Sequence, residues 1–243
     1  MADAVFEHPR LAAVYDALDS DRGDLDAYSA LVDELGARTV LDIGCGTGTF
    51  ALLLSGRGLD VTALDPAAAM LDVARAKPGA ERVRWLHGTA VALPEMQVDL
   101  SAMTGNVAQA IPDPVDWSAT LRGAHDALRP GGHLVFETRD PARRQWEEWN
   151  RAASWSTTVV PGIGAVESWN EVLRVRGPLV TFRWTFVFAS DGAVLTSEST
   201  LRFRESDEVQ AQLEAHGYAV VDVRDAPDRP GRELVFVARR RPG

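Results

Sequence analysis

Short apolar runs separated by segments of helical periodicity characterise the first 140 residues of the chain. Apolar runs typical of buried parallel strands occur at residues 40–43, 61–64, 83–86, 98–103 and 133–137. Segments with helical spacing lie among them, at residues 49–54, 66–76 and 117–128. This alternation predicts an α/β fold, a doubly wound and mostly parallel sheet with helices on both faces.

Both ends of the chain add elements to this core. Two helices are predicted before the first strand, at residues 9–18 and 25–35. After residue 205 a helix is predicted at 206–216, followed by strands at 218–224 and 233–239. We expect these last two strands to join the main sheet as an antiparallel pair, which gives seven strands with the last one antiparallel.

The pattern changes between residues 141 and 205, where three segments alternate between polar and apolar positions. They cover residues 165–176, 179–189 and 194–204, joined by turn-forming residues, and so predict an antiparallel meander. Trp169, Leu173 and Val175 are expected to share one face of it. The chain is thus divided into a core with N-terminal helices (1–140), an inserted β region (141–205) and a C-terminal completion of the core (206–243). The insertion either packs on the core or a second copy of itself, or forms the wall of an acceptor pocket.

The stretch V-L-D-I-G-C-G-T-G-T-F at residues 40–50 combines a strand, a glycine turn and a helix start. Glycines permit positive φ there and let a ligand lie on the backbone, in front of the helix N–H groups. A dinucleotide would prefer a third glycine where Thr49 stands. Asp42 would repel a pyrophosphate and attract an ammonium or a sulfonium. Asp65, at the end of the second strand, could accept hydrogen bonds from both hydroxyls of a ribose.

Composition excludes several other function classes. The formal net charge of −10 disfavours nucleic-acid binding, which needs a basic face. The single cysteine, Cys45, permits no internal disulfide and no cysteine zinc cluster, and we expect no metal. We expect no membrane association and a cytoplasmic location, because no apolar run approaches a membrane span and no signal peptide precedes the first helix.

The pattern Asp42-x-Gly44-x-Gly46-x-Gly48, then Asp65, resembles the first two motifs of class I S-adenosylmethionine-dependent methyltransferases. The sequence L-R-P-G-G-H-L at residues 128–134 is similar to the turn that these enzymes carry before their fifth strand. The resemblance implies a Rossmann-like fold and S-adenosyl-L-methionine as cofactor, with S-adenosyl-L-homocysteine as product. It also implies methyl transfer to N or O of a small molecule by in-line displacement.

Cofactor contacts follow from this resemblance. Met70 would pack on the adenine or belong to the core, and Thr89 stands where family members often have an acid that binds the adenine amino group. Either its hydroxyl or the next N–H would then recognise adenine. The predicted cofactor-binding residues are Asp42, Gly44, Cys45, Gly46, Gly48, Asp65, Pro66, Met70, Thr89, Ala90, Thr104 and Gly105.

The acceptor would lie beside the loop after the fourth strand, because ligands bind beyond the carboxyl ends of parallel strands. Asn106 and Gln109 could orient it or merely cap a turn, and Arg139 could contact a carboxylate or phosphate or pair with Asp140. By analogy the N-terminal helices would form a lid. The predicted acceptor contacts are Tyr28, Gln109, Arg139, Trp169 and Trp184. A base is needed only for an acceptor that arrives protonated, and the candidates are His8, Tyr15 and Asn106.

Two other functions stay open at this stage. A non-catalytic S-adenosylmethionine-binding protein would share the same cofactor motifs, and an NAD-linked Rossmann oxidoreductase would share the glycine turn. The sequence predicts a small-molecule acceptor and a possible homodimer through the β insertion. It does not specify the acceptor.

Overall fold

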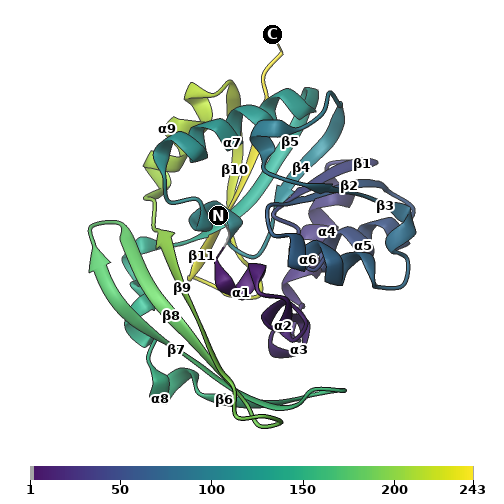
Figure 1. Cartoon of the computed structure of the whole chain (residues 1–243). Coiled ribbons are helices and arrows are strands. Elements are labelled where there is room, and N and C mark those ends of the chain that lie inside the picture. Colours follow the sequence, from purple (N-terminus) through teal and green to yellow (C-terminus); the bar gives the residue numbers. More distant parts are fainter. Residues whose placement is uncertain (1–2, 243) are drawn as a thin grey trace.

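The computed structural model describes residues 3–242, and its main element is a seven-stranded sheet with the strand order β10-β11-β5-β4-β1-β2-β3 (Figure 1). The strands are β1 (Thr39–Ile43), β2 (Asp60–Asp65), β3 (Val83–His87), β4 (Val98–Met103), β5 (Leu128–Arg139), β10 (Tyr218–Asp225) and β11 (Glu233–Arg240). β11 runs antiparallel to β10 and to β5, while β1 to β5 pair in parallel. The predicted fold class is confirmed, including the antiparallel last strand.

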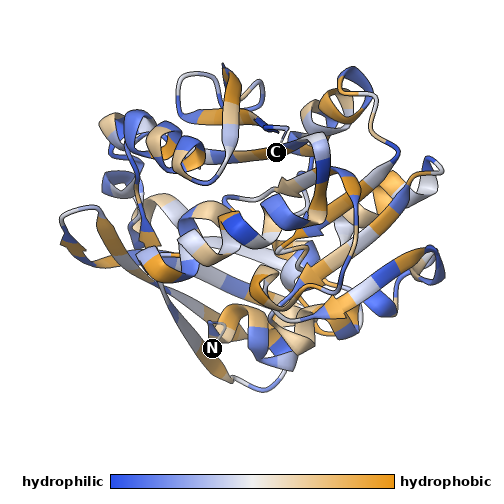
Figure 2. Ribbon diagram, turned by 90° about the horizontal axis from the view of Figure 1, so that it is seen from above, coloured by the Kyte–Doolittle hydropathy of each residue, from blue (hydrophilic) through white to orange (hydrophobic). Residues whose placement is uncertain are grey.

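Helices cover both faces of this sheet (Figures 1 and 2). On one face lie α4 (Asp24–Glu34) and α5 (Thr49–Gly56), and on the other lie α7 (Pro114–Ala127) and α9 (Ser206–Ala215). Along β1, Val40 packs with α4 and α5, whereas Leu41 and Ile43 pack with α7 and α9. A strand buried on both faces explains the continuous apolar run in the sequence. No helix of the described residues 3–242 is long and apolar enough to cross a membrane.

α7 approaches the turn η2 (Ala90–Ala92) so closely that Gly123 has no room for a side chain. A Cβ at this position would lie 1.9 Å from the carbonyl oxygen of Ala90. Gly123→Ala is therefore expected to lower the free energy of unfolding by about 2 kcal/mol, through overpacking against backbone. Urea denaturation measures this change.

Gly56→Ala is the matched control for that substitution. Gly56 is also helical, in α5, and nothing lies within 4 Å of a Cβ built there. This variant is expected to be as stable as the parent or slightly more stable, since alanine favours the helix. Equal stability of the two variants would contradict the close packing of α7 on η2.

A second sheet of four antiparallel strands lies beside the core, in the order β6-β7-β8-β9 (Figure 1). Its strands are β6 (Ser156–Val160), β7 (Gly164–Arg176), β8 (Leu179–Phe188) and β9 (Val194–Arg202). The antiparallel meander is confirmed, and its strands all lie within residues 141–205. β6 was not predicted, because S-T-T-V-V is too short and too polar to give a strand signal. Before it come η4 (Pro141–Arg143), η5 (Gln145–Glu148) and α8 (Arg151–Ser154).

The prediction that Trp169, Leu173 and Val175 share one face is wrong. Trp169 pairs with Thr185 and Val175 pairs with Val180, with a register shift between residues 172 and 174. Paired residues lie on the same face, and positions 185 and 180 of β8 differ in parity. The bulge at Leu173 thus moves the rest of β7 to the other face.

Short N-terminal helices cover the inner face of the small sheet and join it to the core (Figure 1). They are α1 (Ala4–Glu7), α2 (Pro9–Ala12) and α3 (Tyr15–Leu18). Val5, Leu11 and Val14 pack against a cluster that includes Phe186 and Phe188 of β8. α1 and α2 also contact α6 (Ala68–Arg75). The single helix predicted over residues 9–18 is wrong: the Val14 N–H bonds to the carbonyl of Leu11 in a tight turn, and the helix divides there.

Candidate functional site

The glycine turn after β1 has the left-handed backbone that its sequence requires. Gly44, Gly46 and Gly48 have φ values of 73°, 54° and 78°. A Cβ on Gly48 would lie 2.4 Å from the ring of Trp85, so this glycine permits helix packing. A Cβ on Gly46 would meet nothing within 4 Å. The open space over Gly46 is therefore where a ligand can approach the backbone.

Asp65 at the end of β2 is held against this turn by two backbone hydrogen bonds. Its Oδ2 accepts from the Gly46 N–H and its Oδ1 from the Ala67 N–H, both at 2.8 Å. Burial raises the pKa of Asp65, and the two N–H donors oppose that rise. The carboxylate is thus oriented before any ligand binds, as the predicted ribose contact requires.

Asp42 is buried beside the turn without a partner. Its side chain is 1% exposed, and neither carboxylate oxygen accepts a hydrogen bond from the described residues. Burial, and then the charge of Asp65, raise its pKa to about 7, while the charge of Arg22 and the backbone N–H of Ala51 oppose the rise only in part. A buried carboxylate with no compensating donor is unfavourable, and a cationic ligand group would relieve it. The site accordingly fits an ammonium or a sulfonium and does not fit a pyrophosphate.

α3 is fastened to the glycine turn by Asp16. The Thr47 hydroxyl donates to Asp16 Oδ1 at 2.5 Å, and Lys77 Nζ lies 2.5 Å from Asp16 Oδ2. The neighbouring residue is Tyr15, whose pKa burial raises to about 12. Tyr15 is therefore a neutral phenol near pH 7 and can donate a proton to a hydrogen bond. His8 is exposed, and its Nδ1 accepts from the Arg10 N–H at 3.2 Å as the N-cap of α2.

The remaining predicted cofactor residues follow the carboxyl ends of four neighbouring strands. Met70 is 0% exposed and packs in a cluster with Ala12 and Ala67. This position agrees with the second of its two predicted roles, that of a core residue. Beyond the strand ends lie Gly44, Cys45, Gly46 and Gly48 after β1, Asp65 and Pro66 at β2, Thr89 and Ala90 after β3, and Thr104 and Gly105 after β4. One edge of the sheet thus collects them, and their role as cofactor contacts remains a prediction.

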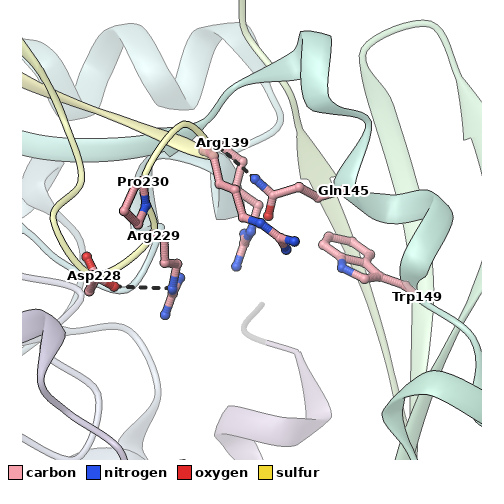
Figure 3. Close-up of a pocket in the computed structure, with 7 residues that line it drawn as sticks. Arg139, Gln145, Trp149, Asp228, Arg229 and Pro230 are labelled. Atoms are coloured by element: carbon pink, nitrogen blue, oxygen red, sulfur yellow. Dashed lines mark hydrogen bonds and ion pairs between the residues drawn. The ribbon is translucent and has the colours of Figure 1, made fainter.

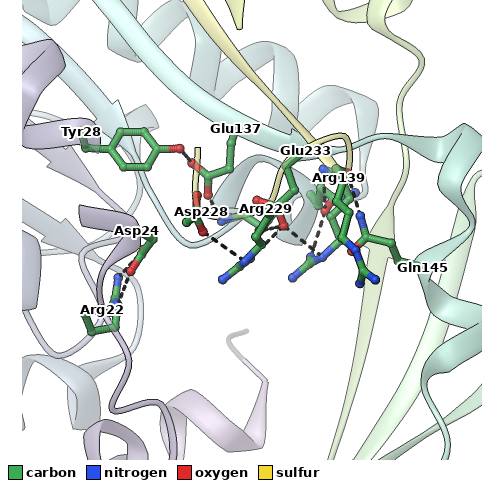
Figure 4. A network of polar contacts seen from close by, with 12 residues as sticks. Arg22, Asp24, Tyr28, Glu137, Arg139, Gln145, Asp228, Arg229 and Glu233 are labelled. Atoms are coloured by element: carbon green, nitrogen blue, oxygen red, sulfur yellow. Dashed lines mark hydrogen bonds and ion pairs between the residues drawn. The ribbon is translucent and has the colours of Figure 1, made fainter. Parts of the chain in front are cut away.

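The loop after β4 is supported from behind by a buried network (Figure 4). The hydroxyl of Tyr28 and the backbone N–H of Asn106 both donate to the carboxylate of Glu137. Burial raises the pKa of Glu137 to about 7, although these two donors oppose the rise. Asn106 has a φ of 61°, and its Nδ2 donates to Glu233 Oε1 at 3.2 Å. Tyr28 is 6% exposed, and its hydroxyl supports the loop through Glu137. The acceptor contact predicted for it remains a prediction.

Gln109 and Arg139, both predicted as acceptor contacts, are brought together. Arg139 Nη1 donates to Gln109 Oε1 at 3.1 Å. Trp184 lies on the inner face of the small sheet, with its ring stacked on Phe186 at 5.9 Å. Trp169 lies on the opposite face of this sheet, because it pairs with Thr185. The two tryptophans thus lie on opposite faces of the sheet, and their role as acceptor contacts remains a prediction.

A pocket of about 520 Å³ opens at the end of β5 (Figure 3). Its lining comes from β5, from the segment around η5 and from the connection between β10 and β11. The lining residues are Arg139, Gln145, Trp149, Asp228, Arg229, Pro230 and Arg232. Sequence reasoning identified only Arg139 among them, and it also missed the supporting residue Glu233. A glutamate that follows the apolar strand end, as Glu137 does in V-F-E-T-R, is the one signal that could have indicated the network.

Comparisons with known proteins agree with this geometry. Residues 40–132 match the family described as "Methyltransferase domain". The malonyl-[acyl-carrier protein] O-methyltransferase of Serratia marcescens is 35% identical over 137 residues, which covers 52% of each chain. The chain spans about half the length of the first curated relatives it matches.

Two solved structures share the fold over nearly the whole chain. An S-adenosylmethionine-dependent methyltransferase from Clostridium acetobutylicum ATCC 824 has a TM-score of 0.75 at 17% identity and covers 96% of this chain and 98% of its own. A sugar N-methyltransferase from Streptoalloteichus sp. ATCC 53650 has a TM-score of 0.75 at 22% identity, and the match covers 100% of this chain and 96% of that protein. Residues 40–132 thus match a methyltransferase domain, and nearly the whole chain has the fold of S-adenosylmethionine-dependent methyltransferases.

Proposed function

We propose that this protein transfers a methyl group from S-adenosyl-L-methionine to a nitrogen or oxygen of a small molecule and releases S-adenosyl-L-homocysteine. The observation that carries the proposal is the buried carboxylate of Asp42, which has no hydrogen-bond partner among residues 3–242, beside the open backbone at Gly46. Relatives named as an O-methyltransferase and a sugar N-methyltransferase support both acceptor atoms.

In this proposal the residues of the glycine turn and Asp42 hold the amino-acid end of the cofactor, and Asp65 holds the ribose hydroxyls. The bound cofactor supplies an already activated methyl group. The protein therefore has to align the acceptor with it and exclude water. α3, fastened to the turn through Asp16 and Thr47, provides that cover.

This mechanism needs a base to remove a proton only if the acceptor binds in its protonated form. Tyr15 is a neutral donor near pH 7, and the amide of Asn106 has no basic group, so both are suited to orienting the acceptor. His8, as the exposed cap of α2, remains the third candidate for a base. An acceptor that binds in its neutral form needs none of them.

The function is tested by two measurements on the full chain. Calorimetry with S-adenosylhomocysteine is expected to show one site, and a panel of amines, phenols and carboxylic acids with S-adenosylmethionine is expected to give turnover with at least one acceptor. Binding without turnover on any acceptor would favour a non-catalytic binding protein. Binding of NAD in place of S-adenosylhomocysteine would overturn the proposal.

We also propose that residues 141–205 form a separate unit that closes the acceptor side and pairs two copies of the chain. Trp155, Val159 and Val194 support this pairing, because they are 50%, 76% and 59% exposed on or next to the small sheet. Light scattering after size-exclusion chromatography should then give twice the chain mass. A mass of one chain at all concentrations would rule out the dimer.

A further inference from the structure

The pocket at the end of β5 brings several arginine side chains together in a chain whose formal net charge is −10. Three arginines line it, Arg139 from the end of β5 and Arg229 and Arg232 from the β10–β11 connection. The guanidinium groups of Arg139 and Arg229 point toward the same open space (Figure 3). One carboxylate, that of Asp228, is among the lining residues.

The carboxylates near these arginines leave some guanidinium donors free. Glu233 is 3% exposed and is shared, with its Oε1 2.8 Å from Arg229 Nη1 and 3.6 Å from Arg139 Nε. Asp228 Oδ2 also lies 3.3 Å from Arg229 Nε, and both of these side chains are partly exposed. Glu148 approaches Arg232 at 3.3 Å, but both side chains are more than half exposed, so water screens this pair. Arg139 Nη2 donates to no acceptor within residues 3–242.

The pocket is also built for positioning. Gln145 Nε2 donates to the carbonyl of Arg232 at 2.7 Å, and the Gly231 N–H donates to both oxygens of Asp225 at 2.7 and 2.9 Å. These bonds fix the β10–β11 connection. The ring of Trp149 lies 5.6 Å from the Arg139 guanidinium and forms a flat apolar wall.

This charged pocket is joined directly to the loop after β4. Glu233 accepts from Asn106 Nδ2, and Arg139 donates to Gln109, so two side chains of that loop bond to residues at the pocket. Glu233 and Arg139 lie near each other in Figure 4. Asn106 Oδ1 and Gln109 Nε2 are buried and have no partner in the described part of the chain. They offer one acceptor and one donor between the charged groups and the predicted position of the methyl.

We propose that the methyl acceptor carries an anionic group, a carboxylate or a phosphate, that binds in this pocket against Arg139, Arg229 and Arg232. The inference rests on the proposed function for the identity of the ligand as an acceptor. Guanidinium groups match both oxyanions with paired hydrogen bonds. The volume of about 520 Å³ is within the range of small-molecule sites. The anion fixes one end of the acceptor and leaves its nucleophilic atom beside Gly105 and Asn106.

Calorimetry at constant ionic strength tests the site, with sodium pyrophosphate, sodium phosphate or sodium acetate titrated into the protein with and without S-adenosylhomocysteine. At least one of the three is expected to bind saturably above a potassium chloride background. Arg229→Gln and Arg232→Gln should each weaken that binding by about tenfold, since each removes charged hydrogen-bond donors. A preference for acetate identifies a carboxylate, and a preference for the phosphates identifies a phosphoryl group.

Arg144→Gln is the matched control, because this arginine is 63% exposed, pairs with Glu147 and does not line the pocket. It should bind the anion as the parent does. Equal anion affinity in all three variants, or no binding above chloride while S-adenosylhomocysteine binds normally, would overturn the inference alone. Arginine-dependent anion binding without S-adenosylhomocysteine binding would instead overturn the proposed function. Thermal unfolding of each variant shows whether weaker anion binding comes from loss of fold. Arg139→Lys tests Arg139 in the same way, because it keeps the positive charge opposite Glu233.

Discussion

Replacing Asp65 by alanine is expected to weaken the binding of S-adenosylhomocysteine by about 3 kcal/mol, or roughly 100-fold. The two ribose hydroxyls would lose a charged acceptor, and each hydrogen bond to a charged group contributes about 1.5–3 kcal/mol net of water, so the expected loss is the low end for two bonds. The glycine turn would also lose its hold at Gly46, whose N–H now donates to Asp65. Isothermal titration calorimetry at pH 7.5 measures the change.

Two further variants separate the ribose contact from the turn. Asp65→Asn keeps an oxygen that can accept from one of the backbone donors, so it should lose less affinity than the alanine variant. Asp72→Ala replaces an aspartate in α6 whose side chain is 76% exposed and should bind as the parent does. Unchanged affinity in Asp65→Ala, with the fold intact by circular dichroism, would remove Asp65 from the cofactor site.

Local pattern was sufficient to predict the structure of the glycine turn and the position of Asp65 beside it. The strand, the glycine turn and Asp42 lie within eleven residues, and Asp65 ends the next strand, so the parallel pairing of β1 with β2 brings them together. The turn and the strand depend on backbone conformation, which the local sequence indicates directly. A positive φ favours glycine, and a short continuous apolar run is typical of a strand buried on both faces.

The pocket at the end of β5 could not be predicted in the same way, because it depends on strand register across long separations. Arg139 and Glu233 are cross-strand partners of β5 and β11, and nothing in either segment specifies that pairing. The same pairing brings Arg229 and Arg232 to the pocket. In β7 a single bulge at Leu173 places the side chains after it on the face opposite to the one that the alternating pattern predicts. A one-residue shift of this kind leaves the alternating pattern intact to the eye but moves each side chain to the other face.

Replacing Asp42 by asparagine is expected to change stability and cofactor affinity in opposite directions. In the ligand-free protein the pKa of Asp42 is raised to about 7, chiefly by burial, from an unfolded value near 3.9. The folded state therefore binds this proton more tightly, and stability falls as pH rises from about 4 to about 7. At pH 8 the ionised, partnerless carboxylate lowers the free energy of unfolding by as much as about 4 kcal/mol, which Asp42→Asn would restore. At pH 4 the two proteins should be equally stable.

Glu137 titrates in the same range and in the same direction, so the variant retains part of the pH dependence. Urea denaturation from pH 5 to pH 8 should show that the free energy of unfolding decreases less steeply with pH in Asp42→Asn than in the parent. The affinity for the cofactor should be lower in Asp42→Asn than in the parent, because a ligand ammonium is attracted to the ionised carboxylate.

The affinity of the parent for S-adenosylhomocysteine is therefore expected to increase from pH 6 to pH 8. Asp42→Asn should bind it roughly 10- to 100-fold more weakly at pH 8 and with little pH dependence. Asp60→Asn, at an exposed position on β2, should show neither effect. An Asp42→Asn protein that is less stable than the parent at pH 8 would mean that the carboxylate already has a donor in the free protein. Its role as the waiting partner of the cofactor ammonium would then be lost, since a satisfied carboxylate has no excess charge for a ligand to compensate.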